Sequence, residues 1–91
     1  MSDPVRDNRE RSRYELEIDG QIAFAIYRRD GATLSILHVE APPSLRGTGA
    51  AGKLMQGVME MARATGAKIV PLCGYAAAWL RRHREFGELV A

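Results

Sequence analysis

Hydrophobic and polar residues alternate in the first half of the chain, which predicts three antiparallel β-strands. Apolar and acidic side chains alternate over residues 14–19, as expected of a strand with one buried face. Residues 22–27 carry apolar side chains on both faces and predict a more buried strand, and a third run follows at residues 33–40. Asp19-Gly20 and Asp30-Gly31 are hairpin-turn signals, so we expect two consecutive hairpins.

The pattern changes to a helical period in the second half of the chain. Residues 49–65 predict a helix whose inward face carries Ala51, Leu54, Met55, Val58 and Ala62. Gly66 is well placed to end this helix in the left-handed conformation. Residues 68–72 are a short apolar run that predicts a fourth strand, and residues 76–83 suit a second helix. Residues 85–91 form a short terminal segment.

These elements predict an α/β fold in the order β-β-β-α-β-α. The antiparallel hairpins come first. The helix at residues 49–65 then joins the third strand to the fourth, so we expect that pair to be parallel, with a right-handed crossover. Residues 13–91 make a single domain in this interpretation. Residues 1–12 are almost all charged or polar, so we expect them to be a disordered tail.

Composition narrows the class of protein. The 91 residues make one small domain, and 13 Lys and Arg against 11 Asp and Glu leave a net charge of only +2. No basic run is long enough for a nucleic-acid interface, and no apolar stretch has the length of a membrane-spanning helix or a signal-peptide core. The single cysteine cannot form an internal disulfide. We therefore expect a cytoplasmic protein with neither nucleic acid nor membrane as partner, and we assign no metal site.

A glycine-rich turn at the start of the first helix is the strongest candidate for a binding site. Gly47, Gly49 and Gly52 leave backbone N–H groups uncovered. The helix N-terminus behind them adds unpaired N–H groups and the positive end of the helix dipole. Such a combination is typical of an anion site, most often for phosphate, and Arg46 at the mouth of the turn can add a charged hydrogen bond. The alternative is an ordinary tight turn before a helix.

Residues 47–52 also match the dinucleotide fingerprint Gly-x-Gly-x-x-Gly, but its wider context is lacking. Pro42 and Pro43 interrupt the approach to the loop, and the next predicted strand, residues 68–72, carries no acidic residue. Neither Lys-Ser nor Lys-Thr follows the loop, as a nucleoside-triphosphate site requires. A nucleotide-binding module is therefore only our third hypothesis.

The loop is similar to that of a different family. Arg46-x-x-Gly49-x-Ala51, preceded by a strand and a proline-containing bend, resembles the pyrophosphate loop of the GNAT superfamily of acyl-CoA N-acyltransferases. A wider resemblance, to the very small single-domain GNAT-like N-acetyltransferases, rests on His38–Gly49, Val70–Tyr75 and Arg82–His83. It covers residues 14–90. A full-size GNAT domain has an extra strand and two helices near its start, and we expect this chain to lack that segment.

The resemblance implies acetyl-CoA as the cofactor and indicates which residues hold it. The cofactor-binding residues carried over are Val39, Arg46, Gly47, Thr48, Gly49, Ala50, Ala51 and Tyr75. In this family strand backbone binds the pantetheine arm, so an N–H near Val39 is the expected donor to the thioester oxygen. Tyr75 is a candidate proton donor to the leaving CoA thiolate, with simple packing as the alternative.

Three residues are candidates for catalysis: Cys73, His38 and Glu40. The resemblance places Cys73 where two central strands diverge around the thioester, either as an acyl-carrying nucleophile or as a small buried hydrophobe. His38 is of the residue type that most often serves as general base. Alternation puts Glu40 on the same face, where it can orient the imidazole. The alternative is a strand histidine satisfied by a neighbouring carboxylate.

We therefore expect an N-acetyltransferase that moves the acetyl group of acetyl-CoA to an amine. The acceptor is a small molecule or a protein, and a homodimer would be one way to complete its site. The second hypothesis is a non-catalytic acyl-CoA-binding or sensing module, which the missing acceptor-side segment favours.

Overall fold

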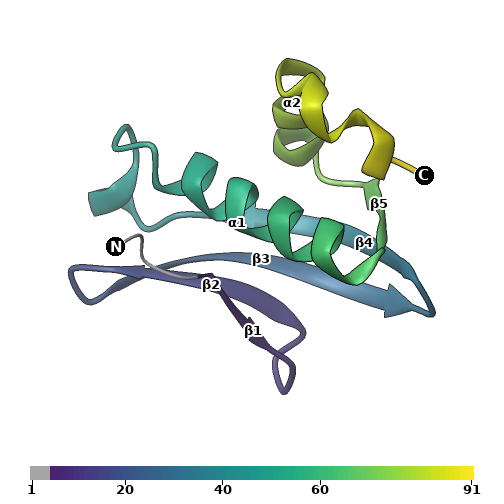
Figure 1. Ribbon diagram of the computed structural model, residues 1–91. Helices are drawn as coiled ribbons and strands as arrows, with labels where there is room; N and C mark the ends of the chain where they lie inside the picture. Colours follow the sequence, from purple (N-terminus) through teal and green to yellow (C-terminus); the bar gives the residue numbers. More distant parts are fainter. Residues whose placement is uncertain (1–4) are drawn as a thin grey trace.

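The computed structural model describes residues 5–91 as a five-stranded sheet with two α-helices on one side (Figure 1). The strands are β1 (Arg6–Asn8), β2 (Arg13–Ile18), β3 (Gln21–Asp30), β4 (Thr33–Glu40) and β5 (Lys68–Pro71). The helices are α1 (Ala50–Thr65) and α2 (Gly74–Arg82), with short 3-10 helices η1 (Pro43–Leu45) and η2 (Arg84–Leu89). Within residues 5–91 neither α-helix is long and apolar enough to cross a bilayer.

The strands lie in the sheet in the order of the sequence. β1 to β4 are antiparallel neighbours, and β5 lies parallel to β4. Gly20 and Gly31 adopt the left-handed φ values of 77° and 61° that the two hairpin turns require. Gly66 ends α1 in the same region, with φ 75°. The α/β class, the two hairpins and the parallel pair joined by α1 are confirmed.

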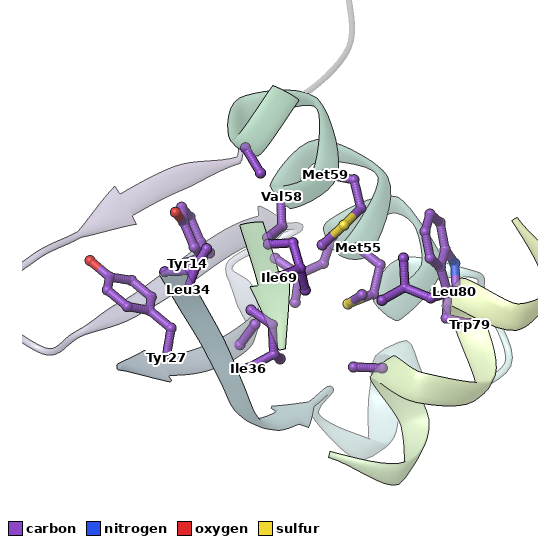
Figure 2. Close-up of a cluster of buried hydrophobic side chains, with 14 of the residues drawn as sticks. Tyr14, Tyr27, Leu34, Ile36, Met55, Val58, Met59, Ile69, Trp79 and Leu80 are labelled. Carbon is purple, nitrogen blue, oxygen red and sulfur yellow. The ribbon is translucent and has the colours of Figure 1, made fainter. Parts of the chain in front are cut away.

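The hydrophobic core lies between α1 and one face of the sheet (Figure 2). β3 presents Ala23 and Ala25 to this core, and both are fully buried. Because alanine is small, the helix can approach the middle of the sheet closely. Leu54, Met55, Val58, Met59 and Ala62 of α1 fill the remaining space.

The opposite face of the sheet has no second layer in the described part of the chain. Ile22, Phe24 and Ile26 of β3 point to this side, and each is only half-buried. The guanidinium of Arg13 lies 4.6 Å from the ring centre of Phe24 and covers part of it. One side of the sheet is therefore a packed core, and the other is open.

The prediction of a disordered tail over residues 1–12 is wrong for the part that can be described. Residues 6–8 form β1 and pair with β2, and residues 9–12 make the turn between them. Residues 1–4, the rest of that predicted tail, lie outside the described residues. We also expected the chain to lack the extra strand that a full-size GNAT domain has near its start, and this is corrected, because β1 is a short strand at that place. Between β1 and β2 the chain forms only a turn and not the two helices of a full-size domain.

A buried carboxylate explains why this polar segment is ordered. Glu15 of β2 is 3% exposed and accepts hydrogen bonds from Arg6, Asn8 and Arg13. Burial alone would raise the pKa of Glu15, but these hydrogen bonds outweigh it and hold the pKa below its ordinary value. Without the two partners from β1 the carboxylate would lose much of this compensation, so β1 and Glu15 depend on each other.

A second contact fixes β1 to the core side of the sheet. The hydroxyl of Tyr27 donates a hydrogen bond to Asp7. Burial first, and then the Asp7 carboxylate, raise the pKa of Tyr27 to about 12. Val5, immediately before β1, packs against Gly57 of α1 so closely that a Cβ on that glycine would lie 2.8 Å from Cβ of Val5. The N-terminal segment therefore contacts both the sheet and the helix.

Candidate functional site

The turn between β4 and α1 has the backbone conformation of a glycine-dependent loop. Gly47 and Gly49 have φ values of 80° and 85°, which disfavour residues with a Cβ. Gly49 is the N-cap residue of α1 and offers no side chain to cap the helix. The first turn of α1 also contains no acidic residue. Neither the N-cap nor the first turn of α1 therefore supplies an anion to the positive end of the helix dipole.

Several amide groups of this loop are free to bind a ligand. The N–H of Thr48 donates to the carbonyl of Leu45, and that of Lys53 donates to the carbonyl of Gly49. Within residues 5–91, no acceptor pairs with the amides of Gly47, Gly49, Ala50, Ala51 and Gly52. Unpaired N–H groups of successive residues at a helix start are a favourable site for phosphate oxygens.

Two exposed cations flank the loop. Nε of Arg46 donates to the carbonyl of Ala41 at 3.3 Å, which leaves the terminal nitrogens of the guanidinium available. Lys53 lies exposed in the first turn of α1. No carboxylate pairs with Arg46 or Lys53 in the part of the chain that the structure describes. Both charges are therefore free to meet an anionic ligand.

The start of α2 covers the first turn of α1. A Cβ placed on Gly52 would lie 4.0 Å from the hydroxyl of Tyr75 and 3.7 Å from Nε1 of Trp79. Tyr75 is 37% exposed, whereas Trp79 is buried among the residues drawn in Figure 2. The structure thus brings Tyr75, from α2, next to the loop residues that were predicted to bind the same cofactor.

β4 and β5 diverge close to this loop. Their last pair is Ile36 with Pro71, and the carbonyl of Ile36 then accepts hydrogen bonds from the N–H groups of both Leu72 and Cys73. On the β3 side, the pairing passes from Ile36 directly to His38, so Leu37 is an extra residue in β4. The remainder of β4 has no strand beside it on the β5 side within residues 5–91.

Exposed apolar side chains lie around this divergence. Leu37 of β4 is 37% exposed and Leu72, directly after β5, is 58% exposed. Tyr75, three residues further, is also among the exposed large hydrophobic residues. Val39, the predicted donor residue, pairs with Ala25 and is half-buried. An extended ligand with an apolar arm has both backbone and apolar surface available here.

Cys73 lies at the same divergence. It is the N-cap residue of α2, it is half-buried, and its side chain packs against the core. Among the described residues its thiol makes no hydrogen bond, and neither histidine contacts it in that way. The position agrees with the prediction, but the base that a nucleophilic thiol needs is not brought to Cys73.

His38 and Glu40 form the pair that alternation predicted. Nε2 of His38 lies 2.9 Å from Oε1 of Glu40, and both side chains are about half exposed. Because a carboxylate only accepts, Nε2 carries the proton and Nδ1 of a neutral ring is left as an acceptor. These residues pair with Ile26 and Phe24 of β3, which places them on the open face of the sheet. They therefore lie on the side opposite the core and α1.

His83 is part of the packing of α2. Its Nδ1–H donates to the carbonyl of Trp79 at 2.8 Å, and the two rings stack with centroids 3.7 Å apart. Arg81, Arg82 and Arg84 beside it are exposed. His83 therefore stabilises the C-terminal end of α2 through these contacts.

The structure gathers seven of the eight predicted cofactor residues at the start of α1, where the loop from Arg46 to Ala51 leads into Gly52 and Gly52 lies beside Tyr75 of α2; the eighth, Val39, lies in β4. It divides the predicted catalytic residues, because Cys73 lies at the strand divergence and the pair of His38 and Glu40 on the open face. The contact of Trp79 with Gly52 was not predicted. Its only sequence signal is the spacing of Tyr75 and Trp79, which are one helical turn apart.

Comparisons with known proteins agree with this geometry. A sequence model of the family described as GCN5-related N-acetyl-transferase matches residues 13–89. The solution NMR structure of a GCN5-like protein from Staphylococcus aureus shares the fold, with a TM-score of 0.75 and 24% identity over 100% of this chain and 91% of that chain. No curated protein gave a significant match. Because the family match spans most of its length, the chain belongs to the GCN5-related N-acetyltransferase (GNAT) family.

Proposed function

We propose that this protein binds acetyl-CoA at the loop before α1 and transfers the acetyl group to an amine. The observation that carries the proposal is the set of five amides, of Gly47, Gly49, Ala50, Ala51 and Gly52, that have no acceptor within residues 5–91; they lie at the uncapped start of α1 and next to the divergence of β4 and β5. The family of the chain supports acetyl transfer as the reaction class.

The residues of the loop fit a diphosphate. Positive φ at Gly47 and Gly49 turns the backbone without a Cβ, and the amides of Ala50 and Ala51 point out of the helix start. The guanidinium of Arg46 adds charge on the same side. When bound, acetyl-CoA supplies the thioester carbonyl that the amine attacks. The exposed backbone of β4 near Val39 would hold the pantetheine arm and donate to the carbonyl oxygen as it gains charge.

The pair on the open face suits the acceptor side. A protonated amine is not a nucleophile, so a group must take its proton before or during attack. Nδ1 of His38 is the free acceptor of the pair, and the carboxylate of Glu40 fixes the orientation of the ring. Because His38 and α1 lie on opposite faces, the acceptor would approach from the side that the cofactor loop does not occupy.

The alternative path uses the thiol of Cys73. Its thiolate would attack the thioester, CoA thiolate would leave, and the amine would then take the acetyl group from sulfur. The position of Cys73 beside the divergence supports this route, whereas the lack of a hydrogen-bonded base among the described residues argues against it.

A non-catalytic acyl-CoA-binding module is the second candidate function. The open face of the sheet favours it, because residues 9–12 form only a turn and the described chain builds no wall for an acceptor. Turnover separates the two functions. We would incubate the protein with acetyl-CoA and each of a panel of polyamines, lysine peptides and small amines, and measure the CoA that is released. The rate of CoA release by His38→Ala would be compared with that of the parent protein.

Calorimetric titration tests the binding step. Acetyl-CoA and CoA should both bind, and NAD and ATP should bind more weakly. Binding of NAD or ATP in preference to CoA would contradict the loop assignment. Selective CoA binding without turnover on any amine would leave the non-catalytic module as the better description.

A further inference from the structure

The indole N–H of Trp79 is a hydrogen-bond donor for which the described chain provides no acceptor. Trp79 is 3% exposed and packs against the rings of His83 and Phe86. Its Nε1–H donates no hydrogen bond to any residue from 5 to 91. An indole nitrogen can only donate, so a partner for this group must be an acceptor.

The nitrogen must nevertheless reach the surface. In the described part of the chain, every side-chain nitrogen or oxygen that is sealed from solvent has a hydrogen-bond partner. Nε1 has no partner among residues 5–91, so within the described chain this edge of an otherwise buried ring is open. Burying such a donor beneath a ligand that offers no acceptor would weaken binding, and a ligand with an acceptor would satisfy it.

The open edge of Trp79 borders the free amides of α1. A Cβ on Gly52 would lie 3.7 Å from Nε1, so the absence of a side chain at Gly52 keeps this space clear. The amides of Ala50, Ala51 and Gly52 have no acceptor among the described residues. The hydroxyl of Tyr75 lies beside the same glycine. Donors from α1 and α2 thus lie next to one shared space.

We propose that Trp79 is a ligand-binding residue of this site and that its Nε1–H donates a hydrogen bond to an oxygen of the bound acyl-CoA. The identity of the ligand rests on the proposed function. The ring stack with His83 holds the indole in place before the ligand arrives, so little side-chain freedom is lost on binding. Gly52 serves the same interaction by leaving Nε1 uncovered.

NMR spectroscopy gives a direct test, because Trp79 is the only tryptophan and its indole N–H gives a single signal. CoA is titrated into the 15N-labelled protein. We expect the indole signal and the amide signals of residues 47–53 to shift together, with slower exchange of the indole proton with water. Loop shifts without an indole change would overturn the role of Trp79 and leave the proposed function intact. No shift at either place would remove both.

Two variants separate the donor from the packing. Trp79→Phe keeps an aromatic ring for His83 and Phe86 but removes the donor, and we expect about tenfold weaker CoA binding. Gly52→Ala adds a methyl group at ordinary contact distance from Nε1, so it should fold normally and also bind CoA about tenfold more weakly. Gly87→Ala, which meets no atom within 4 Å, is the matched control and should bind like the parent.

The outcome of Gly52→Ala decides the case if Trp79→Phe folds poorly. Parent-like affinity in a folded Gly52→Ala protein would overturn the proposal. A second result would also overturn the proposal: the indole signal shifts with CoA, but a folded Trp79→Phe protein keeps its full CoA affinity. The ring would then lie near the ligand without donating a hydrogen bond to it.

Discussion

A single charge at Gly49 should weaken CoA binding by at least about 100-fold without unfolding the protein. Gly49 is the N-cap residue of α1, it has φ 85°, and no atom lies within 4 Å of a Cβ added there. The Cβ of an aspartate at this position therefore meets no steric clash within the described chain. It places a carboxylate at the start of α1, where the proposed diphosphate would bind.

The two effects of Gly49→Asp have different sizes. A left-handed backbone costs a non-glycine residue about 1 kcal/mol, and the favourable position of a carboxylate at a helix N-terminus offsets about half of that. Stability should therefore change little. Repulsion between the carboxylate and one phosphate charge about 5 Å away is roughly 3 kcal/mol at an effective dielectric constant near 20, so affinity should fall at least about 100-fold.

Gly49→Asn is the matched control, because asparagine has nearly the same shape and backbone preference but no charge. Calorimetry with CoA measures affinity, and urea denaturation measures the free energy of unfolding. We expect the Asn variant to lose about tenfold or less in affinity, and the Asp variant to fall well below it. Equal CoA affinity of the two variants would refute the reasoning, because the carboxylate would then not face the phosphates.

Three further predictions concern β1, the buried carboxylate and the thiol. In Gly57→Ala the new methyl group would overlap the side chain of Val5, so the free energy of unfolding, measured by urea denaturation, should fall by about 1–3 kcal/mol. The control Gly87→Ala should keep a free energy of unfolding close to that of the parent. The pKa of Glu15 is lowered in the folded state, so its stabilisation is present above about pH 4.3 and is lost as the pH falls through the folded-state pKa. Glu15→Gln should flatten the acid side of the stability curve, and an unchanged acid slope would contradict this assignment. Cys73→Ser should keep its CoA affinity; a loss of turnover of about 100-fold or more would favour the acyl-thiol route, and a change below about threefold would favour direct transfer.

Much of the fold follows from local patterns. The alternation and the Asp-Gly turns predicted β2 to β4, and the left-handed Gly66 marked the end of α1. β1 could not be found in this way, because its residues are polar and their order depends on pairing with β2 and on side-chain contacts with Glu15 and Tyr27 outside the strand. Local sequence indicates propensity, whereas this strand is stabilised by hydrogen bonds to a buried carboxylate on the neighbouring strand.

In the candidate site, too, some features follow from local sequence patterns and others depend on contacts between elements. The loop was visible because glycine, arginine and a helix start occur together in the sequence, and alternation placed His38 and Glu40 on one face. The contact between Gly52 and Trp79 depends on how α1 and α2 lie relative to each other. No local pattern contains that information, so the donor of Trp79 emerged only from the assembled fold.

The one-sided layering of the sheet has a consequence for selectivity. If the acceptor approaches across Ile26 and His38, it meets a flat sheet surface, and no other element of the described chain encloses it. A flat, open surface cannot exclude a bulky molecule. Discrimination among acceptors would therefore depend on how readily each amine gives up its proton rather than on its shape. Rates across a series of amines should then follow their basicity closely and their size only weakly.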